Sequence, residues 1–207
     1  MCDCIIFAGS ELNVSCFDTK ALNNKFVICA DKGVVHAKKL GIAPDLIVGD
    51  FDSLGYKPDN DCRIMSFDPE KDDTDLMIAV KEAVKRNKKC IEIYGALGGR
   101  LDHTIGNIQA LAYAVQNGAS ASLISDSDIA TVYKPGEYEV KNKKGFSLSL
   151  FSFSEKVCSL TISGVKYPLE NGCITNSFPI GVSNEIIGET AGIAFEKGLL
   201  LLVMSRL

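Results

Sequence analysis

The chain has 207 residues, of which 46% are hydrophobic, so it can bury one large core or two modest ones. Its formal net charge of −4 comes without a basic stripe. This excludes a long nucleic acid as the expected partner, because such a partner needs clustered lysines and arginines against its phosphates, and it favours a small ligand that arrives with a metal ion.

Up to about residue 125, short apolar runs alternate with helical patterns. Strands are predicted at residues 4–8, 26–30, 46–48, 63–67, 90–94 and 121–124. Two amphipathic helices lie among them, one with Leu76, Val80, Ala83 and Val84 on a face, the other with Ile105, Ile108, Leu111, Ala112 and Val115. We therefore expect an N-terminal α/β/α domain over residues 1–126, with a mostly parallel sheet and helices on both faces.

Beyond Asp128 the pattern changes to alternating strands punctuated by glycine and proline. It predicts a C-terminal all-β sandwich domain over residues 127–207. The apolar run 198–204 is too short to cross a bilayer and indicates a buried strand, so no membrane partner is expected.

The eight cysteines are scattered, several of them within apolar runs, which indicates buried free thiols in a reducing cytosol. Cys2 and Cys4 lack a second pair at zinc-site spacing, so we expect no zinc. Because Asp3 interrupts a very short apolar run with no basic segment before it, nothing resembles a signal peptide. A cytoplasmic location is the expectation.

Two carboxylates follow the strand 46–48. Asp50 and Asp52 would lie beyond the carboxyl end of a parallel strand, where open α/β sheets bind ligands. Their spacing points both side chains to one side, so they can share a magnesium ion or cap a turn. Asp72, Asp73 and Asp75 crowd the start of the next helix, more acids than a cap requires, and Asp75 could face the same cleft.

Two further strand ends carry candidate phosphate contacts. Gly98, Gly99 and Arg100 join a strand to the helix that contains Asp102 and His103, and a glycine turn before a helix N-terminus favours phosphate. Arg100 could pair with phosphate or stack on a base, and His103 could contact ligand or belong to the helix cap. Asp31, Lys32 and Gly33 form a weaker nucleotide candidate, whereas an ordinary structural role is favoured for His36.

Taken in order, the motifs at 30–33, 44–53, 71–75 and 98–104 closely resemble those of the thiamine pyrophosphokinase family. Residues 164–169 and 181–185 look like the thiamine-binding domain of its bacterial members. The resemblance spans nearly the whole chain. It implies pyrophosphoryl transfer from ATP to thiamine in a homodimer, with ATP held by the α/β domain and thiamine bound by the β-sandwich near the subunit interface.

By this resemblance, Asp50, Asp52, Asp75 and Asp102 match the acidic residues around magnesium and the phosphates, as both metal ligands and catalytic residues. Asp102 either completes the metal shell or orients the thiamine hydroxyl. The expected nucleotide contacts are Asp31, Lys32, Gly33, Gly98, Gly99, Arg100 and His103. The expected substrate contacts are Thr74, Ser183, Asn184 and Glu185.

The chain departs from the family pattern at Lys32 and Val35, which replace a glycine and an amide near the nucleotide. Lys32 either adds a cation near phosphate or is simply solvated. Two alternatives therefore stay open: a related phosphotransferase that acts on another alcohol, and a non-catalytic nucleotide or thiamine sensor. The full acidic set favours an enzyme.

Overall fold

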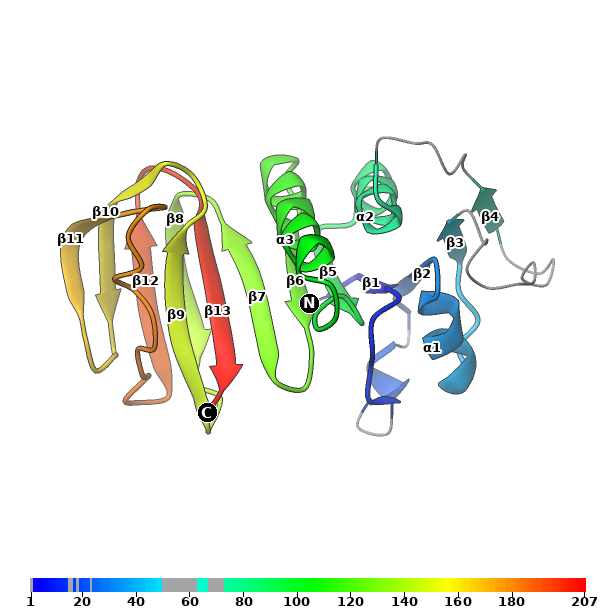
Figure 1. Cartoon of the computed structure of the whole chain (residues 1–207), viewed down its shortest axis with the longest axis horizontal. Helices are drawn as coiled ribbons and strands as arrows, with labels where there is room; N and C mark the ends of the chain where they lie inside the picture. Colours follow the sequence, from blue (N-terminus) through cyan, green and yellow to red (C-terminus); the bar gives the residue numbers. More distant parts are fainter. Residues whose placement is uncertain (1, 15–16, 18, 23, 50–62, 67–72) are drawn as a thin grey trace. The chain divides into compact units, whose positions relative to one another are not determined.

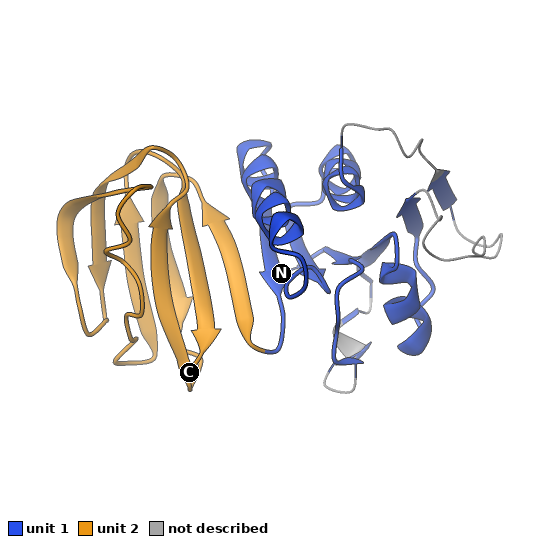
Figure 2. Ribbon diagram, viewed as in Figure 1, with its two compact units in different colours: residues 1–126 blue, residues 127–207 orange. Residues whose placement is uncertain are grey.

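The computed structural model describes residues 2–14, 17, 19–22, 24–49, 63–66 and 73–207. Its chain divides into two compact units, residues 1–126 and 127–207 (Figure 2). Each unit contains a hydrophobic core of its own.

Six parallel strands form the sheet in the described part of the first unit. They are β1 (Cys4–Phe7), β2 (Phe26–Ala30), β3 (Leu46–Gly49), β4 (Arg63–Ser66), β5 (Cys90–Tyr94) and β6 (Ser120–Ile124). Their order is β4-β3-β2-β1-β5-β6, and each neighbouring pair is parallel. The predicted mostly parallel sheet is thus confirmed, with each strand close to its predicted bounds.

Helices cover both faces of this sheet. Figure 1 shows α1 (Gly33–Lys39) on one face and α2 (Asp75–Lys85) and α3 (Leu101–Gln116) on the other; a short 3-10 helix, η2, spans Thr19–Leu22. Ile5 and Phe7 of β1 share a core cluster with Val34 of α1. Because strand side chains alternate between faces, the intervening Ile6 points to the opposite side of the sheet.

The buried faces of the two longer helices match the prediction in part. Leu76, Val80 and Ala83 of α2 are buried as expected. In α3 the predicted Ile105 is instead 52% exposed, and the polar Asn107 is buried. The buried Asn107 is satisfied, because its side-chain amide donates to the Ala96 carbonyl at 2.8 Å.

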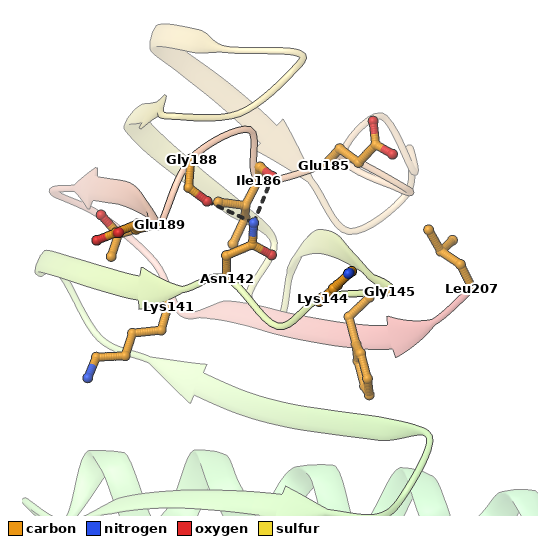
Figure 3. Close-up of a pocket in the computed structure, with 11 residues that line it drawn as sticks. Lys141, Asn142, Lys144, Gly145, Glu185, Ile186, Gly188, Glu189 and Leu207 are labelled. Carbon is orange, nitrogen blue, oxygen red and sulfur yellow. Dashed lines mark hydrogen bonds between the residues drawn. The ribbon is translucent and has the colours of Figure 1, made fainter.

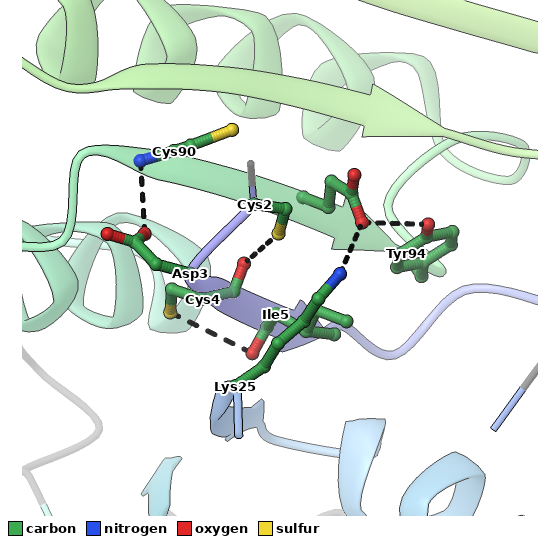
Figure 4. Close-up of polar contacts among 8 residues, drawn as sticks. Cys2, Asp3, Cys4, Ile5, Lys25, Cys90 and Tyr94 are labelled. Atoms are coloured by element: carbon green, nitrogen blue, oxygen red, sulfur yellow. Dashed lines mark hydrogen bonds and ion pairs between the residues drawn. The ribbon is translucent and has the colours of Figure 1, made fainter. Parts of the chain in front are cut away.

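Polar contacts align β1 with β5 at the start of the sheet (Figure 4). The Asp3 carboxylate accepts hydrogen bonds from the backbone amides of Lys89 and Cys90 at 3.0 and 3.1 Å. Glu92 of β5 accepts a hydrogen bond from the Tyr94 hydroxyl at 3.2 Å and lies 3.8 Å from the Lys25 ammonium. The Asp3 contacts thus join the start of β1 to that of β5, and the ion pair of Glu92 joins β5 to Lys25, which precedes β2.

The second unit is the predicted β-sandwich. One group of antiparallel strands has the order β7 (Asp128–Tyr133), β13 (Leu200–Arg206), β9 (Phe146–Ser152). The other has the order β11 (Leu169–Thr175), β10 (Lys156–Ser163), β12 (Thr190–Phe195), β8 (Gly136–Lys141). Buried side chains from both groups form one core, and residues 127–207, all of them described, contain no helix.

The cysteines are less uniformly buried than expected. Cys4 and Cys29 are buried, and Cys2, Cys90 and Cys158 are partly buried. Cys173 is exposed, although its neighbour Ile174 on the same strand β11 is buried, so the burial prediction was wrong for Cys173. Cys16 and Cys62 lie outside the described residues. Within the described parts of the chain, no helix is both long and apolar enough to cross a membrane.

Candidate functional site

A cavity of about 490 Å³ opens in the first unit where β1, β2 and β5 end. Its wall combines acidic, basic and small polar side chains. The lining residues are Ala8, Gly9, Ser10, Ala30, Asp31, Lys32, Asp73, Thr74, Asp75, Leu76, Gly95, Arg100, His103 and Asn107. The structure therefore brings together residues from the predicted motifs at 30–33, 71–75 and 98–104, as expected for the carboxyl edge of an open α/β sheet.

The turn from β2 into α1 supplies Asp31 and Lys32. Asp31 adopts a left-handed φ of 47°, and its backbone amide donates to the Val48 carbonyl at 2.8 Å. Strained backbone of this kind is common at ligand sites. Gly33 is buried and not a lining residue: a Cβ there would lie 1.9 Å from the Phe7 carbonyl oxygen, so glycine allows α1 to begin against β1.

The start of α2 supplies two carboxylates. Asp75 is the first residue of the helix, and Asp73 precedes it and pairs with the Lys81 ammonium at 2.6 Å. Thr74, predicted to contact substrate, caps the helix: its hydroxyl oxygen accepts the Met77 amide at 3.2 Å while the residue also lines the cavity. Thr74 thus caps the helix, and the carboxylates of Asp73 and Asp75 both line the cavity.

The glycine turn before α3 leads to Arg100, and the first turn of α3 supplies His103. Gly95 starts this turn with φ +66°, and a Cβ there would lie 2.6 Å from the Ala8 carbonyl oxygen. Gly98 and Gly99 also adopt positive φ angles but do not line the cavity, so their role as nucleotide contacts stays a prediction.

Asp102 lies at the surface beside the cavity rather than among its lining residues. Its carboxylate pairs with the Arg100 guanidinium at 2.5 Å and accepts the His103 amide at 2.9 Å. The hydrogen bond from Arg100 lowers the pKa of Asp102, so this carboxylate is ionised at neutral pH. Its predicted metal role stays a prediction.

Sequence reasoning did not select two polar residues at this site. Ser10 and Asn107 line the cavity, and the Ser10 amide donates to the Gly95 carbonyl at 2.7 Å. The buried His36 ring bonds the Ser10 carbonyl through Nε2 at 2.8 Å, which requires the proton on Nε2 and gives His36 the structural role that was favoured. Ser10 could have been found from its position in the sequence. It comes shortly after the end of β1, just as Asp31 and Gly95 come after the ends of β2 and β5.

The donor set of the cavity suits a divalent metal ion in part. Carboxylates of Asp31, Asp73 and Asp75 line it, and carboxylate oxygens are the ligands that hard divalent cations prefer. Within the described residues, however, no three histidine, cysteine, aspartate or glutamate side chains are grouped closely enough to complete a metal site. Asp50 and Asp52 directly follow β3 and lie outside the described residues.

In the second unit, Asn184 is tightly bound to its neighbours. Its side-chain oxygen accepts the Tyr167 amide at 3.0 Å, and its side-chain nitrogen donates to the Tyr167 carbonyl at 2.8 Å. Ser183, at a left-handed φ of 59°, donates its amide to the Ser149 hydroxyl at 3.0 Å. Asn184 and Tyr167 both line an apolar cavity of about 230 Å³.

Glu185 lines a different hollow of the same unit, with a volume of about 790 Å³ (Figure 3). Here Asn142 donates its side-chain amide to the carbonyls of Ile186 and Gly188 at 3.1 and 2.8 Å. Glu185 also pairs with the Lys166 ammonium at 3.1 Å. The three predicted substrate contacts at 183–185 therefore do not all border one cavity, and their roles stay predictions.

Replacing Asn184 with alanine is expected to lower the free energy of unfolding by about 1–2 kcal/mol, since two hydrogen bonds to the Tyr167 backbone are lost. Asn184→Asp should cost a similar amount, because a carboxylate cannot donate to the Tyr167 carbonyl. Urea unfolding followed by circular dichroism measures both, with exposed Asn176→Ala as the matched control. Equal stability of all three variants would contradict this role.

Both units of the chain are similar to known protein families. A family model described as "Thiamin pyrophosphokinase, catalytic domain" matches residues 17–123, and one described as "Thiamin pyrophosphokinase, vitamin B1 binding domain" matches residues 137–200. The thiamine pyrophosphokinase of Bacillus subtilis (strain 168) is 35% identical over 184 residues, covering 86% of each chain.

Solved structures of thiamine pyrophosphokinases are also similar to this chain. The crystal structure of thiamine pyrophosphokinase from Bacillus subtilis superposes with a TM-score of 0.88 at 32% identity and covers 98% of both chains. That of thiamin pyrophosphokinase from Geobacillus thermodenitrificans gives a TM-score of 0.84 at 29% identity, with 98% of this chain and 97% of the other covered.

Proposed function

Because the chain belongs to the thiamine pyrophosphokinase family, we propose that it transfers the pyrophosphoryl group of ATP to the hydroxyl of thiamine, giving thiamine diphosphate and AMP. The structural observation that supports this most strongly is the cavity where β1, β2 and β5 end. It combines two cationic side chains, Lys32 and Arg100, with the carboxylates of Asp31, Asp73 and Asp75. A polyphosphate chelated to a metal ion needs both kinds of charge.

The basic and polar residues of the cavity bind the polyphosphate in this proposal. Lys32 and Arg100 bind phosphate oxygens, and Arg100 precedes the N-terminus of the sixteen-residue helix α3, where anions are favoured. His103, in the first turn of α3, adds a further polar contact. These groups hold the polyphosphate in line with a weakly nucleophilic hydroxyl, because positioning supplies most of the catalysis when the protein does little covalent chemistry.

Kinases that use ATP generally require a divalent metal, and the proposed ion here is Mg²⁺, with Asp50, Asp52, Asp75 and Asp102 as its ligands. Once bound, the metal screens the negative charge of the polyphosphate. Asp75 is the member of this set that lines the described cavity. Asp73 joins the set as a further carboxylate at the same wall.

The two units take different substrates in this proposal. Residues 1–126 hold ATP, and residues 127–207 contribute to thiamine binding through Ser183, Asn184 and Glu185, with Thr74 as a contact from the first unit. The match of residues 137–200 to a vitamin B1 binding domain supports the second assignment. The Asn184 side chain, already engaged with the Tyr167 backbone, would then act by positioning this loop.

A homodimer in the cytoplasm is the proposed functional state, with the thiamine sites near the subunit interface. Exposed apolar side chains in the second unit support self-association, because a soluble monomer seldom exposes so many large ones in neighbouring segments. They are Tyr167, Phe178, Ile180, Val182 and Ile187. Light scattering on the purified protein gives the mass in solution directly.

One assay tests the reaction. Purified protein is incubated with ATP, magnesium and thiamine, and both products are separated by chromatography. AMP and thiamine diphosphate in equal amounts are expected, with neither product in reactions that lack thiamine or contain excess chelator. ADP as the nucleotide product would indicate a phosphotransferase of another type. Binding of both substrates without any product would indicate a sensor.

A further inference from the structure

Two cysteines face each other across the β10–β11 ladder of the second unit. The register pairs Cys158 of β10 with Cys173 of β11, and their Sγ atoms lie 2.8 Å apart. Both are free thiols, Cys173 exposed and Cys158 partly buried. Two thiols so close can be joined without movement of either strand.

The hydrogen bonds of the ladder support the same conclusion. The Cys158 amide donates to the Lys197 carbonyl at 3.2 Å, and the Cys158 carbonyl accepts the Glu196 amide at 3.2 Å. Both backbone groups of Cys158 therefore point away from β11, which makes Cys158 and Cys173 a non-hydrogen-bonded pair. In such pairs the Cα atoms approach to about 4.5 Å, within the range that a disulfide spans.

The register shift next to this pair bends the ladder. Pairing moves from Cys158 with Cys173 to Leu160 with Gly172, so Ser159 is the extra residue, with a left-handed φ of 55°. A bulge increases local twist and is usually a specified feature of a fold. Here the bulge lies in β10 directly after Cys158, whereas Cys173 is exposed on the neighbouring edge strand β11.

We propose that Cys158 and Cys173 form a reversible disulfide, which makes this edge of the second unit a thiol–disulfide switch. The oxidant is a low-molecular-weight disulfide such as oxidised glutathione. One protein thiolate attacks it to form a mixed disulfide and releases one glutathione; the second protein thiolate then displaces the other. Two protein thiols lose two electrons and two protons, and one glutathione disulfide becomes two thiols.

The bond would tie the edge strand β11 to β10 beside the apolar cavity of about 230 Å³, which Cys173 lines together with Tyr167 and Asn184. In the described part of the first unit, Cys4 and Cys29 are buried, which limits the access of an oxidant to them. Burial raises the pKa of Cys4 to about 12 and that of Cys2 to about 11, but the hydrogen bond with Cys158 raises the pKa of Cys173 as well. The exposure of Cys173, rather than its pKa, therefore distinguishes this pair.

The test uses the full-length reduced protein in its native state with oxidised glutathione, followed by unfolding, thiol titration and non-reducing peptide mapping. Loss of two of the eight thiols is expected, with one crosslinked peptide pair that contains Cys158 and Cys173 and disappears on reduction. A crosslink between other cysteines, or a stable mixed disulfide on Cys173 in the unmodified chain, would overturn the proposal.

Serine variants provide the matched controls. Cys158→Ser should prevent the internal bond and leave Cys173 as a stable mixed disulfide with glutathione, whereas Cys90→Ser should leave the internal bond unchanged. Circular dichroism before oxidation shows that each variant is folded. If oxidation of a folded Cys158→Ser variant still removed two protein thiols as an internal bond, the assignment of the pair would be wrong.

Discussion

An Asp75→Asn variant is expected to lose on the order of 100-fold in kcat, because one carboxylate at the proposed metal site becomes a neutral amide and several kcal/mol of charge stabilisation depend on that metal. Asp75 begins α2 and lines the cavity where β1, β2 and β5 end. The substitution keeps the size of the side chain, so the fold should be retained. Initial rates of AMP formation at several magnesium concentrations measure the effect.

The matched control is Asp126→Asn, an exposed carboxylate of the same unit that does not line the cavity. It should keep full turnover. Raising the magnesium concentration should restore part of the lost rate in Asp75→Asn if the carboxylate holds the metal, and none if its negative charge only stabilises the N-terminus of α2. A folded Asp75→Asn variant with unchanged kcat and unchanged magnesium dependence would remove Asp75 from the site.

A Gly33→Ala variant is expected to lose about 3 kcal/mol or more in free energy of unfolding, the upper end for overpacking, because the added methyl group meets backbone. Its Cβ would lie 1.9 Å from the Phe7 carbonyl oxygen and 2.4 Å from the Phe7 carbonyl carbon. Neither atom can move aside without separating α1 from β1. The same displacement would shift Asp31 and Lys32, so ATP affinity should fall as well.

Gly106→Ala is the control for this prediction. Gly106 lies within α3, and an added Cβ there meets no atom within 4 Å. Alanine in a helix interior is favoured over glycine by about 1 kcal/mol, so this variant should be unchanged or slightly more stable. Chemical denaturation of both variants and the parent protein gives the comparison. A Gly33→Ala variant as stable as Gly106→Ala would show that this close approach does not constrain the fold.

Much of the architecture could be predicted because its signals are local. The six parallel strands and the helix-free second unit follow from the period of apolar residues and from glycine and proline punctuation. The orientation of α3 could not be predicted in this way. Whether Ile105 or Asn107 is buried depends on how the helix packs on the sheet, and the hydrogen bond that satisfies the buried Asn107 amide goes to the Ala96 carbonyl, outside the helix and its apolar pattern.

The candidate site was predictable in part for the same reason. Asp31, Asp75 and Arg100 were selected because each closely follows a strand or begins a helix, and the topology brings them to one cavity. Gly33 was assigned to the nucleotide, yet its need for glycine comes from the approach of β1. Residue type alone does not distinguish a glycine that admits a ligand from one that admits a neighbouring strand.

The sequence by itself determined the family, the α/β and all-β halves, and the acidic motifs, since these depend on residue order and spacing. Only the tertiary structure decided which residues line the same cavity. It separated Asn184 from Glu185 into different hollows, engaged Asn184 with Tyr167, and placed Cys158 opposite Cys173. These outcomes depend on strand register and long-range packing, which bring together residues that no local pattern connects.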